Sequence, residues 1–430
     1  MRSVFVIAAL LAFGHSAAFA QSLPTASPER MQSRIEALST FGANPEGGVS
    51  RVAFTDEDLA GREWLKAELR GMGLSVSTDT AGNIIGRREG SQPGFPAIMF
   101  GSHIDSVPGG GNYDGQVGVV GALEVISLLN DAKITTRHPL EFVSFTDEEG
   151  GLVGSRAMVG KLTQAGMDVV SNSGLVTRDG IARVGGDPKR IAEAARDPES
   201  LRAFFELHIE QGGILEQKNL QIGVVEGIVG IQWWDITVSG VANHGGTTPM
   251  PQRVDALVSA SELALYINRI ANELEGRQVA TVGRIEAFPG APNVVPGKVV
   301  MSLEIRDLDE KKIWEVFRLI ELESQRIATA RGTPISFTEL DTASPPAPTE
   351  PEMRDIIEAA AQRMGYSYQR MPSGAGHDAQ DLAVITPTGM IFVPSKDGVS
   401  HSPYEYTSPE DMARGATVLL HAILATDDQR

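Results

Sequence analysis

The stretch Ala97-Ile98-Met99-Phe100-Gly101-Ser102-His103-Ile104-Asp105 starts as an apolar run and ends in residues that can do chemistry. A short apolar run with turn signals on both sides predicts a buried strand. Residues 140–145 and 204–207 form two similar runs, which lead into the acid pair Glu148-Glu149 and into His208. Because functional groups gather beyond the carboxyl ends of parallel strands, we expect these side chains at one edge of one sheet.

Helical patterns alternate with these strands, as in residues 117–129. This alternation predicts an α/β domain with a mixed, largely parallel sheet flanked by helices. From about Gln221 the pattern changes: residues 222–238 resemble paired strands, and a β-α-β-β-α order follows. We therefore predict a smaller α+β domain, residues 219–329, inserted into a main domain of residues 28–218 and 330–430.

Residues 1–20 have a different character. Met1-Arg2-Ser3 precedes an apolar run to Phe13, and small residues end in Ala18-Phe19-Ala20. This is the pattern of a secretory signal peptide with an A-x-A cleavage site. The run is shorter than the roughly 20 apolar residues of a membrane span. We expect export to the periplasm or the medium, with no membrane contact after cleavage.

The composition restricts the chemistry. A net charge of -18 repels phosphate backbones, so we expect no nucleic-acid partner. The chain has no cysteine, which excludes disulfides, a thiol nucleophile and thiolate metal ligands. The H-E-x-x-H helix, the phosphate loop and the G-x-S-x-G elbow are also missing from the mature sequence. Any metal must therefore bind to His, Asp and Glu.

The first candidate metal ligands lie in residues 101–115. His103 and Asp105 form an H-x-D step, and a carboxylate behind a metal-binding histidine commonly fixes its tautomer. Asp114 follows a Gly-rich loop and could bridge two metals. The alternative interpretation is a turn that merely links a strand to a helix.

The acid pair Glu148-Glu149 is the second candidate. Adjacent acids usually begin a solvated helix, but these follow an apolar strand. In a two-metal hydrolase one carboxylate can bind metal while its neighbour takes a proton from the attacking water. When His208 and His401 are added to these two segments, three histidines and two carboxylates predict a site for two zinc or manganese ions, with cobalt or nickel as alternatives.

Two further histidines lie in polar loops. His244 occupies a Gly- and Thr-rich loop of the predicted insert, which suits a substrate contact better than a place in the core. His377 follows Ser373-Gly374-Ala375-Gly376 and is another candidate. His138 and His421 have no chemically able neighbours in sequence, so we interpret them as structural.

A series of motifs runs in order from about residue 30 to the C-terminus: H-x-D, Y-D-G, D-E-E-G, E-L-H-I-E-Q-G, A-N-H-x-G-T-T-P-M, P-N-x-x-P, E-I-R-D, G-H-D-A and H-S-P-x-E. This series resembles the amidase branch of the M20 metallopeptidases, which includes N-carbamoyl-L-amino-acid hydrolases, β-ureidopropionases and allantoate amidohydrolases. The resemblance implies a catalytic α/β domain and a small lid domain that also forms a homodimer.

The resemblance also implies a role for each matching residue. One ion would be bound by His103, Asp114 and His208, and the other by Asp114, Glu149 and His401. Glu148 would be the general base, with Asp105 behind the ligands and His244 assisting catalysis. The implied substrate contacts are Gln211, His244, Asn293, Arg306 and His377, with Arg306 as the clamp for a substrate carboxylate.

The sequence departs from the family pattern in two places. Gly245 replaces an alanine, and residues 150–156 are shorter than in typical ureide hydrolases and lack their Arg-Phe step. The leading hypothesis is a hydrolase of a small N-carbamoyl-L-amino acid or related ureide that carries a carboxylate. The alternatives are an exported aminopeptidase or dipeptidase and a non-catalytic solute-binding protein; the intact Glu148-Glu149 pair argues against the last.

Overall fold

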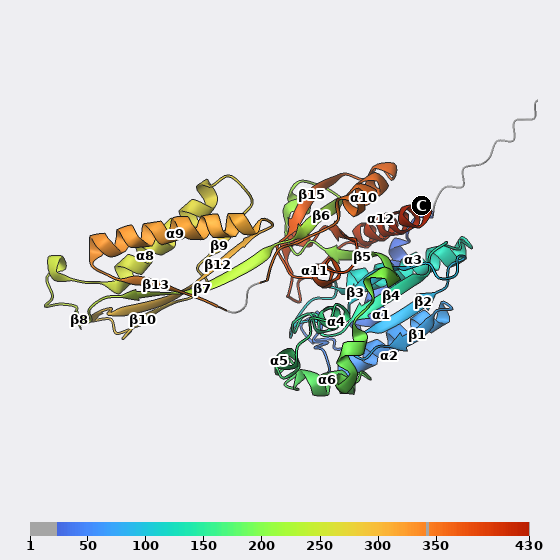
Figure 1. The fold of residues 1–430 in the computed structure, drawn as a ribbon, viewed down its shortest axis with the longest axis horizontal. Coiled ribbons are helices and arrows are strands. Elements are labelled where there is room, and N and C mark those ends of the chain that lie inside the picture. The colour runs from blue at the N-terminus through green and yellow to red at the C-terminus, as the bar shows by residue number, and fades with distance from the viewer. Residues whose placement is uncertain (1–23, 341–343, 430) are drawn as a thin grey trace, which may run out of the picture.

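A computed structural model describes residues 24–340 and 344–429 of the chain. Two sheets of nine and five strands form two separate bodies, and the chain passes from the larger body to the smaller one at Val229 (Figure 1). The predicted signal peptide lies outside the described residues. Within the described part of the chain, no helix is long and apolar enough to cross a membrane.

The larger sheet has the strand order β1-β2-β4-β3-β5-β16-β6-β14, and β15 also pairs with β6. Its centre is parallel and consists of β4 (Leu140–Phe145), β3 (Ala97–His103), β5 (Leu201–Ile209) and β16 (Thr388–Val393). The flanking β2 (Ile84–Arg88) and β6 (Ile222–Ile228) run antiparallel to their central neighbours. The predicted mixed α/β sheet is confirmed, and four carboxyl ends meet at one edge.

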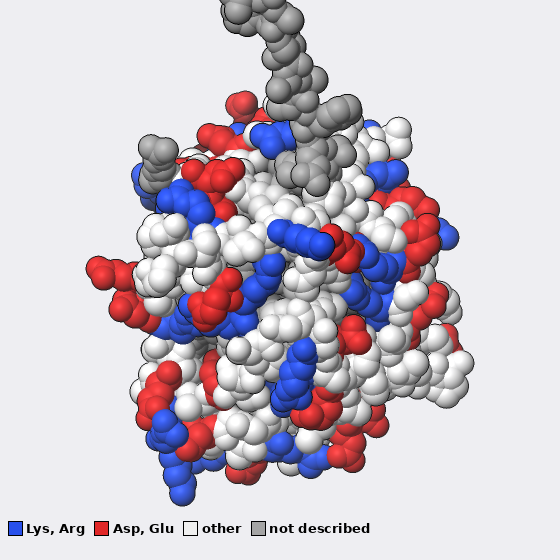
Figure 2. Space-filling model, turned by 90° about the vertical axis from the view of Figure 1, so that its right-hand side faces the viewer, with Lys and Arg blue, Asp and Glu red and all other residues white. Residues whose placement is uncertain are grey.

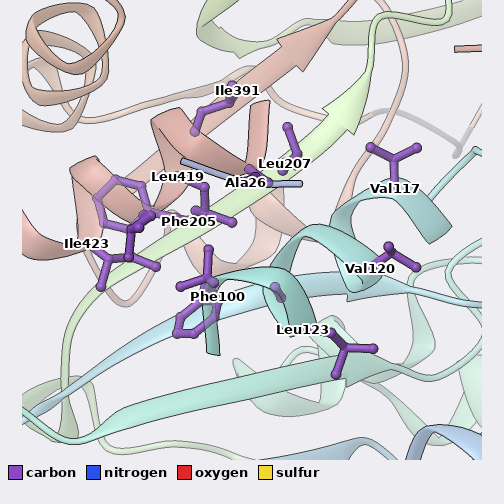
Figure 3. Close-up of a cluster of buried hydrophobic side chains, with 14 of the residues drawn as sticks. Ala26, Phe100, Val117, Val120, Leu123, Phe205, Leu207, Ile391, Leu419 and Ile423 are labelled. Carbon is purple, nitrogen blue, oxygen red and sulfur yellow. The ribbon is translucent and has the colours of Figure 1, made fainter. Parts of the chain in front are cut away.

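Helices cover both faces of this sheet, because successive residues of its central strands alternate between two apolar cores. Phe100 of β3 and Phe205 of β5 pack against Leu123 of α3 (Gln116–Asp131) and Leu419 of α12 (Pro409–Asp428) (Figure 3). The adjacent Met99 belongs to the core on the opposite face. Burying each of these side chains contributes about 1.5–3 kcal/mol, which holds the strand ends in register.

Shorter elements complete the larger body. The predicted capped helix is α2 (Asp56–Gly71), where the side chain of Thr55 accepts a hydrogen bond from the backbone of Asp58. The other helices are α1 (Pro28–Ser39), α4 (Val153–Met158), α5 (Gln164–Met167), α6 (Thr177–Arg183), α7 (Ile214–Gln217), α10 (Pro351–Arg363) and α11 (Asp378–Leu382). The outer strands are β1 (Ser75–Thr78), β14 (Ala347–Pro348) and β15 (Tyr368–Ser373).

The smaller body, which we call the lid, is one sheet with two helices on one face. Its strands are β7 (Gly230–Ser239), β9 (Val279–Thr281), β10 (Ile285–Phe288), β12 (Lys298–Asp307) and β13 (Ile335–Glu339), and its helices are α8 (Ala256–Glu273) and α9 (Glu310–Arg331). A pair of short strands, β8 (Asn243–His244) and β11 (Val294–Val295), forms a separate ribbon. Alternate residues of β12 are buried, as expected of a sheet covered on one face.

The predicted insert, residues 219–329, has the wrong boundaries. The lid sheet begins at Gly230 and ends at Glu339, whereas β6 belongs to the larger sheet. The predicted pairing within residues 222–238 is also wrong, because the chain passes from one sheet to the other between β6 and β7. A burial difference explains this: β6 is buried almost throughout, as in a strand covered on both faces, whereas β7 alternates.

Candidate two-metal active site

The five predicted metal ligands come together at the carboxyl edge of the larger sheet. His103 ends β3, His208 lies near the end of β5, Glu149 follows β4 and His401 follows β16. Asp114 lies in the loop between β3 and α3. Five segments that are distant in sequence therefore converge on one small volume.

Asp114 occupies the centre of this cluster. One of its carboxylate oxygens lies 3.1 Å from His208 Nε2 and 3.7 Å from His103 Nε2. The other lies 3.2 Å from His401 Nε2, which is itself 3.5 Å from a carboxylate oxygen of Glu149. The candidate ligands form two groups, His103 with Asp114 and His208, and Asp114 with Glu149 and His401. Within each group the candidate ligand atoms lie within 4.8 Å of one another. Two sets of ligand atoms thus share one carboxylate.

The backbone orients both buried histidines. Nδ1 of His103 lies 3.1 Å from the carbonyl oxygen of Asp105, and Nδ1 of His208 lies 2.9 Å from that of Ile209. A carbonyl only accepts, so each ring donates its Nδ1–H and turns Nε2 toward Asp114. Burial lowers the pKa of His103 to about 4, and its buried Nε2 has no hydrogen-bond partner among the described residues. A neutral imidazole with an unused lone pair is suited to bind metal.

Asp105 acts differently from the sequence prediction. Its carboxylate is 3.7 Å from His103 Nδ1, beyond hydrogen-bonding distance, and it accepts hydrogen bonds from the backbone N–H groups of Glu149, at 3.1 Å, and Glu148, at 3.4 Å. The backbone carbonyl of Asp105 accepts the hydrogen bond from the imidazole. The carboxylate of Asp105 therefore bonds to the turn after β4 and not to His103. Asp105 therefore positions the acid pair with its side chain and His103 with its main chain.

Gly115 is required by the close packing of this cluster. Its φ of +72° favours glycine, and a Cβ atom would lie 2.3 Å from His103 Nε2. Any larger residue between Asp114 and α3 would displace the imidazole.

The cluster concentrates negative charge. Burial raises the pKa of Glu148 well above its usual range, and the charges of Asp378 and Glu149 add to this effect. Burial and the nearby Asp114 raise the pKa of Glu149 to about 8. Although burial opposes it, Asp114 raises the pKa of His208 to about 9. Bound cations would offset this excess of buried acid and take the place of the proton on His208.

The donor set fits divalent ions. Zinc binds imidazole nitrogen and carboxylate oxygen at about 2.0–2.2 Å, so ligand atoms around one tetrahedral ion lie roughly 3.3 Å apart. The separations of 3.1–3.7 Å around Asp114 match that spacing. A third group, formed by Glu206, His208 and His377, does not fit, because both ring nitrogens of His377 form hydrogen bonds within its own loop.

Two predicted substrate contacts lie close to the larger sheet. Gln211 Nε2 is 2.6 Å from a carboxylate oxygen of Asp114, at the margin of the cluster. Arg306 lies on β12 near the junction of the two bodies, where Nε and Nη2 donate to the carboxylate of Glu304 at 2.8 and 3.1 Å. Its Nη1 donates to the carbonyl of Gly374 at 2.6 Å. Glu304 thus already occupies one edge of this guanidinium.

His377 is closed to substrate in this conformation. It is 1% exposed, its Nε2 lies 2.8 Å from Ser373 Oγ, and its other nitrogen caps α11. Its ring packs edge-on against His208, with the ring centroids 4.4 Å apart. In this structure His377 therefore packs against the candidate ligand His208 and is not positioned as the predicted substrate contact.

The structure does not bring His244 and Asn293 to the cluster. Both are exposed residues of the lid, where the carbonyl of Asn293 accepts a 2.7 Å hydrogen bond from Gly245 next to His244. In Figure 1, β8 lies at the end of the lid away from the larger sheet. Within a single chain they are remote from Asp114.

Sequence reasoning assigned no role to two buried acids near the histidines. Glu206 accepts hydrogen bonds from Ser102 Oγ at 2.7 Å and from the Ala379 backbone at 2.9 Å. Glu405 accepts from the backbone of Asp114 at 3.0 Å. The sequence contains a signal for each of them. Glu206 is an acid inside the apolar run of β5, and Glu405 is the last residue of the H-S-P-x-E motif.

Comparisons with known proteins show which family the chain belongs to. Residues 99–425 match Peptidase family M20/M25/M40. The N-carbamoyl-L-amino acid amidohydrolase of Geobacillus stearothermophilus is 40% identical over 92% of this chain and 97% of its own length. The allantoate amidohydrolase of Bacillus subtilis is 33% identical over 90% of this chain and 94% of its own length.

A solved structure extends this likeness to the whole fold. The amidase of the hydantoinase/carbamoylase family from Burkholderia multivorans has a TM-score of 0.86 and 37% identity, and the match covers 94% of this chain and 99% of that one. Because the family match covers most of its length and relatives of 33–40% identity cover nearly all of it, this chain belongs to peptidase family M20/M25/M40, in its amidase branch.

Proposed function

We propose that this protein hydrolyses a C–N bond of a small linear amide, either an N-carbamoyl-L-amino acid or a related ureide such as allantoate or β-ureidopropionate. The observation that carries the proposal is the pair of ligand groups sharing Asp114, with Glu148 beside them and outside both groups. The named activities of the relatives that match most of the chain support this substrate class over peptides.

The proposed cofactors are two divalent ions per chain. His103, Asp114 and His208 would bind one, and Asp114, Glu149 and His401 the other. Nitrogen and oxygen donors without sulfur suit zinc and manganese, with cobalt and nickel as alternatives. When bound, such ions polarise the scissile carbonyl and lower the pKa of a water molecule.

Glu148 is the proposed general base. Its carboxylate is buried at the cluster, 3.7 Å from His103 Nε2, and a carboxylate held in such a position can accept a proton. It takes one proton from the attacking water as the oxygen bonds to the carbonyl carbon. It then gives that proton to the leaving nitrogen as the C–N bond breaks. Asp105 keeps Glu148 in place through the backbone of the turn.

Arg306 is the proposed contact for the substrate carboxylate, because a guanidinium can pair with that group through two parallel hydrogen bonds and Glu304 occupies only its Nε–Nη2 edge. The test is a substrate screen of the purified protein loaded with zinc or manganese. It compares N-carbamoyl-L-amino acids, allantoate, β-ureidopropionate, dipeptides and the neutral amides of the best acids by ammonia and amine release. We expect each acid to exceed its neutral amide in kcat/KM by at least about tenfold, the value of a charge-assisted contact.

Each other outcome of this screen has a defined meaning. Equal rates on an acid and its amide would contradict the role of Arg306. Turnover of dipeptides alone would establish the peptidase alternative. Binding without turnover of any compound would establish the solute-binding alternative.

We further propose a homodimer formed through the lid. Leu265 and Val258 of α8 are 74% and 43% exposed, and Val279 and Ile285 on the adjacent strands are 53% and 48% exposed. Apolar side chains beside unpaired strand edges favour a contact with a second copy.

On the face seen in Figure 2, acidic and basic side chains are interspersed, so this face offers nucleic acid no continuous basic surface.

Export is proposed from residues 1–20 alone. The apolar run and the small residues Ala18-Phe19-Ala20 predict that the mature protein begins at Gln21. Amino-terminal sequencing of protein from the periplasmic or medium fraction checks this, and an intact Met1 on active protein retained in the cytoplasm would contradict it.

A further inference from the structure

Glu405 connects the two loops that carry Asp114 and His401. It is 4% exposed, and one of its carboxylate oxygens accepts hydrogen bonds from the backbone N–H groups of Tyr113, at 2.9 Å, and Asp114, at 3.0 Å. Its other oxygen accepts from Ser400 Oγ at 2.9 Å. Ser400 directly precedes His401, so one carboxylate holds both loops.

These contacts bear directly on the orientation of Asp114. Two consecutive N–H groups that converge on one oxygen restrain the peptide planes on the amino side of Asp114, and so the backbone from which its side chain extends. Ser400 Oγ also lies 3.1 Å from the Asp114 oxygen that faces His401. A continuous chain of contacts thus joins Glu405, Ser400 and the shared carboxylate.

Gly111 leaves space for this arrangement. A Cβ atom at this position would lie 2.2 Å from the Glu405 oxygen that accepts both backbone hydrogen bonds. The loop before Asp114 is therefore shaped around the carboxylate of Glu405.

We propose that Glu405 is a positioning residue for the two-ion centre: it orients Asp114 and His401 together so that both oxygens of Asp114 face ligand groups. This inference rests on the proposed function and deepens it. Groups that orient metal ligands typically change metal affinity about 10–100-fold when they are removed.

The chain contains a matched control. Asp427, near the end of α12, is also buried and accepts hydrogen bonds from two consecutive backbone N–H groups, those of Arg137 at 2.9 Å and His138 at 2.8 Å. Arg137 and His138 precede β4, at the sheet edge opposite the candidate ligand groups. Asp427→Ala therefore removes the same kind of bonds without touching either metal loop.

The experiment titrates metal-depleted full-length protein with Co²⁺ and follows its visible absorption and binding affinity. Glu405→Ala should weaken binding of at least one ion by about tenfold or more and change the absorption spectrum. Glu405→Gln should stay within about threefold of wild type, because its amide oxygen can accept both backbone bonds and its amide N–H can donate to Ser400. Asp427→Ala should bind Co²⁺ as wild type does.

Unchanged affinity and spectrum in Glu405→Ala would overturn the proposal, as would an equal loss in Asp427→Ala, since that would indicate general destabilisation. If Glu405→Ala does not fold, Gly111→Ala provides the test, because its methyl group crowds the same carboxylate. Gly111→Ala should also weaken Co²⁺ binding, and binding equal to that of wild type would overturn the positioning role of Glu405. Wild-type protein that takes up fewer than two ions would overturn the two-ion centre itself, a failure distinct from that of Glu405 alone.

Discussion

Glu148→Gln is expected to lower kcat at least about a hundredfold while the protein keeps its full complement of ions, the usual scale for loss of a positioned base. The amide has the size of the carboxylate but cannot accept the proton of the attacking water. Glu148 belongs to neither ligand group, and its backbone position depends on Asp105, which the substitution does not change. Steady-state kinetics and metal analysis of the same preparation measure both quantities.

The adjacent acid provides the control for this result. Glu149 lies with Asp114 and His401 in one ligand group, so Glu149→Gln should lose metal as well as activity. Glu148→Gln that keeps activity within about tenfold of wild type would place the base elsewhere. Loss of an ion in Glu148→Gln would make Glu148 a ligand.

His244 is expected to act in the active site of a second chain. In its own chain it lies on β8, at the end of the lid away from the larger sheet (Figure 1). Two backbone hydrogen bonds nevertheless orient its ring. Nδ1 accepts hydrogen bonds from the backbone N–H groups of Gly246, at 3.0 Å, and Thr247, at 3.2 Å. The exposed Nε2 therefore carries the hydrogen and can donate to the oxyanion that forms in the partner's site, where one donor is worth about a hundredfold or more.

Complementation tests this arrangement. Glu148→Ala and His244→Ala homodimers should each be nearly inactive. In a two-fold dimer the two chains exchange what they contribute, so a mixed dimer combines the intact Glu148 of one chain with the intact His244 of the other. With random pairing about half of the dimers are mixed, each with one complete site, and co-expression should restore roughly a quarter of wild-type activity. Inactive mixed dimers would show that His244 serves its own chain.

A second mixture reverses the expectation. A wild-type chain paired with a chain carrying both Glu148→Ala and His244→Ala has no complete site if His244 acts in trans, because the only intact Glu148 faces a partner without His244. If His244 acts in its own chain, the same mixed dimer keeps half of the wild-type activity. Mixed dimers purified with two different affinity tags give this comparison directly.

The sequence predicts the parts of this molecule that depend on neighbouring residues. The apolar runs that lead into His103 and Glu148 are local signals, and the series of motifs predicts the residues that the structure brings together as candidate ligands. The place where the chain leaves one sheet for the other, at Val229, depends on which faces are later covered, so the predicted insert was misplaced by about ten residues.

Long-range contacts account for the other differences. Asp105 was expected to hold His103 with its side chain, but the turn after β4 takes that carboxylate, and only the folded chain brings the two together. The burial of His377 against His208 depends on the packing of β5 against the loop before α11. Glu405 acts on a backbone 291 residues away, a distance over which sequence spacing carries no information.

Metal content tests the central claim most directly. Wild-type protein loaded with zinc or manganese, freed of loosely bound metal and analysed by mass spectrometry, should contain two ions per chain. Asp114→Ala should bind at most one, because both ligand groups share that carboxylate. A stoichiometry near one in the wild type that Asp114→Ala leaves unchanged would contradict the bridged two-ion centre.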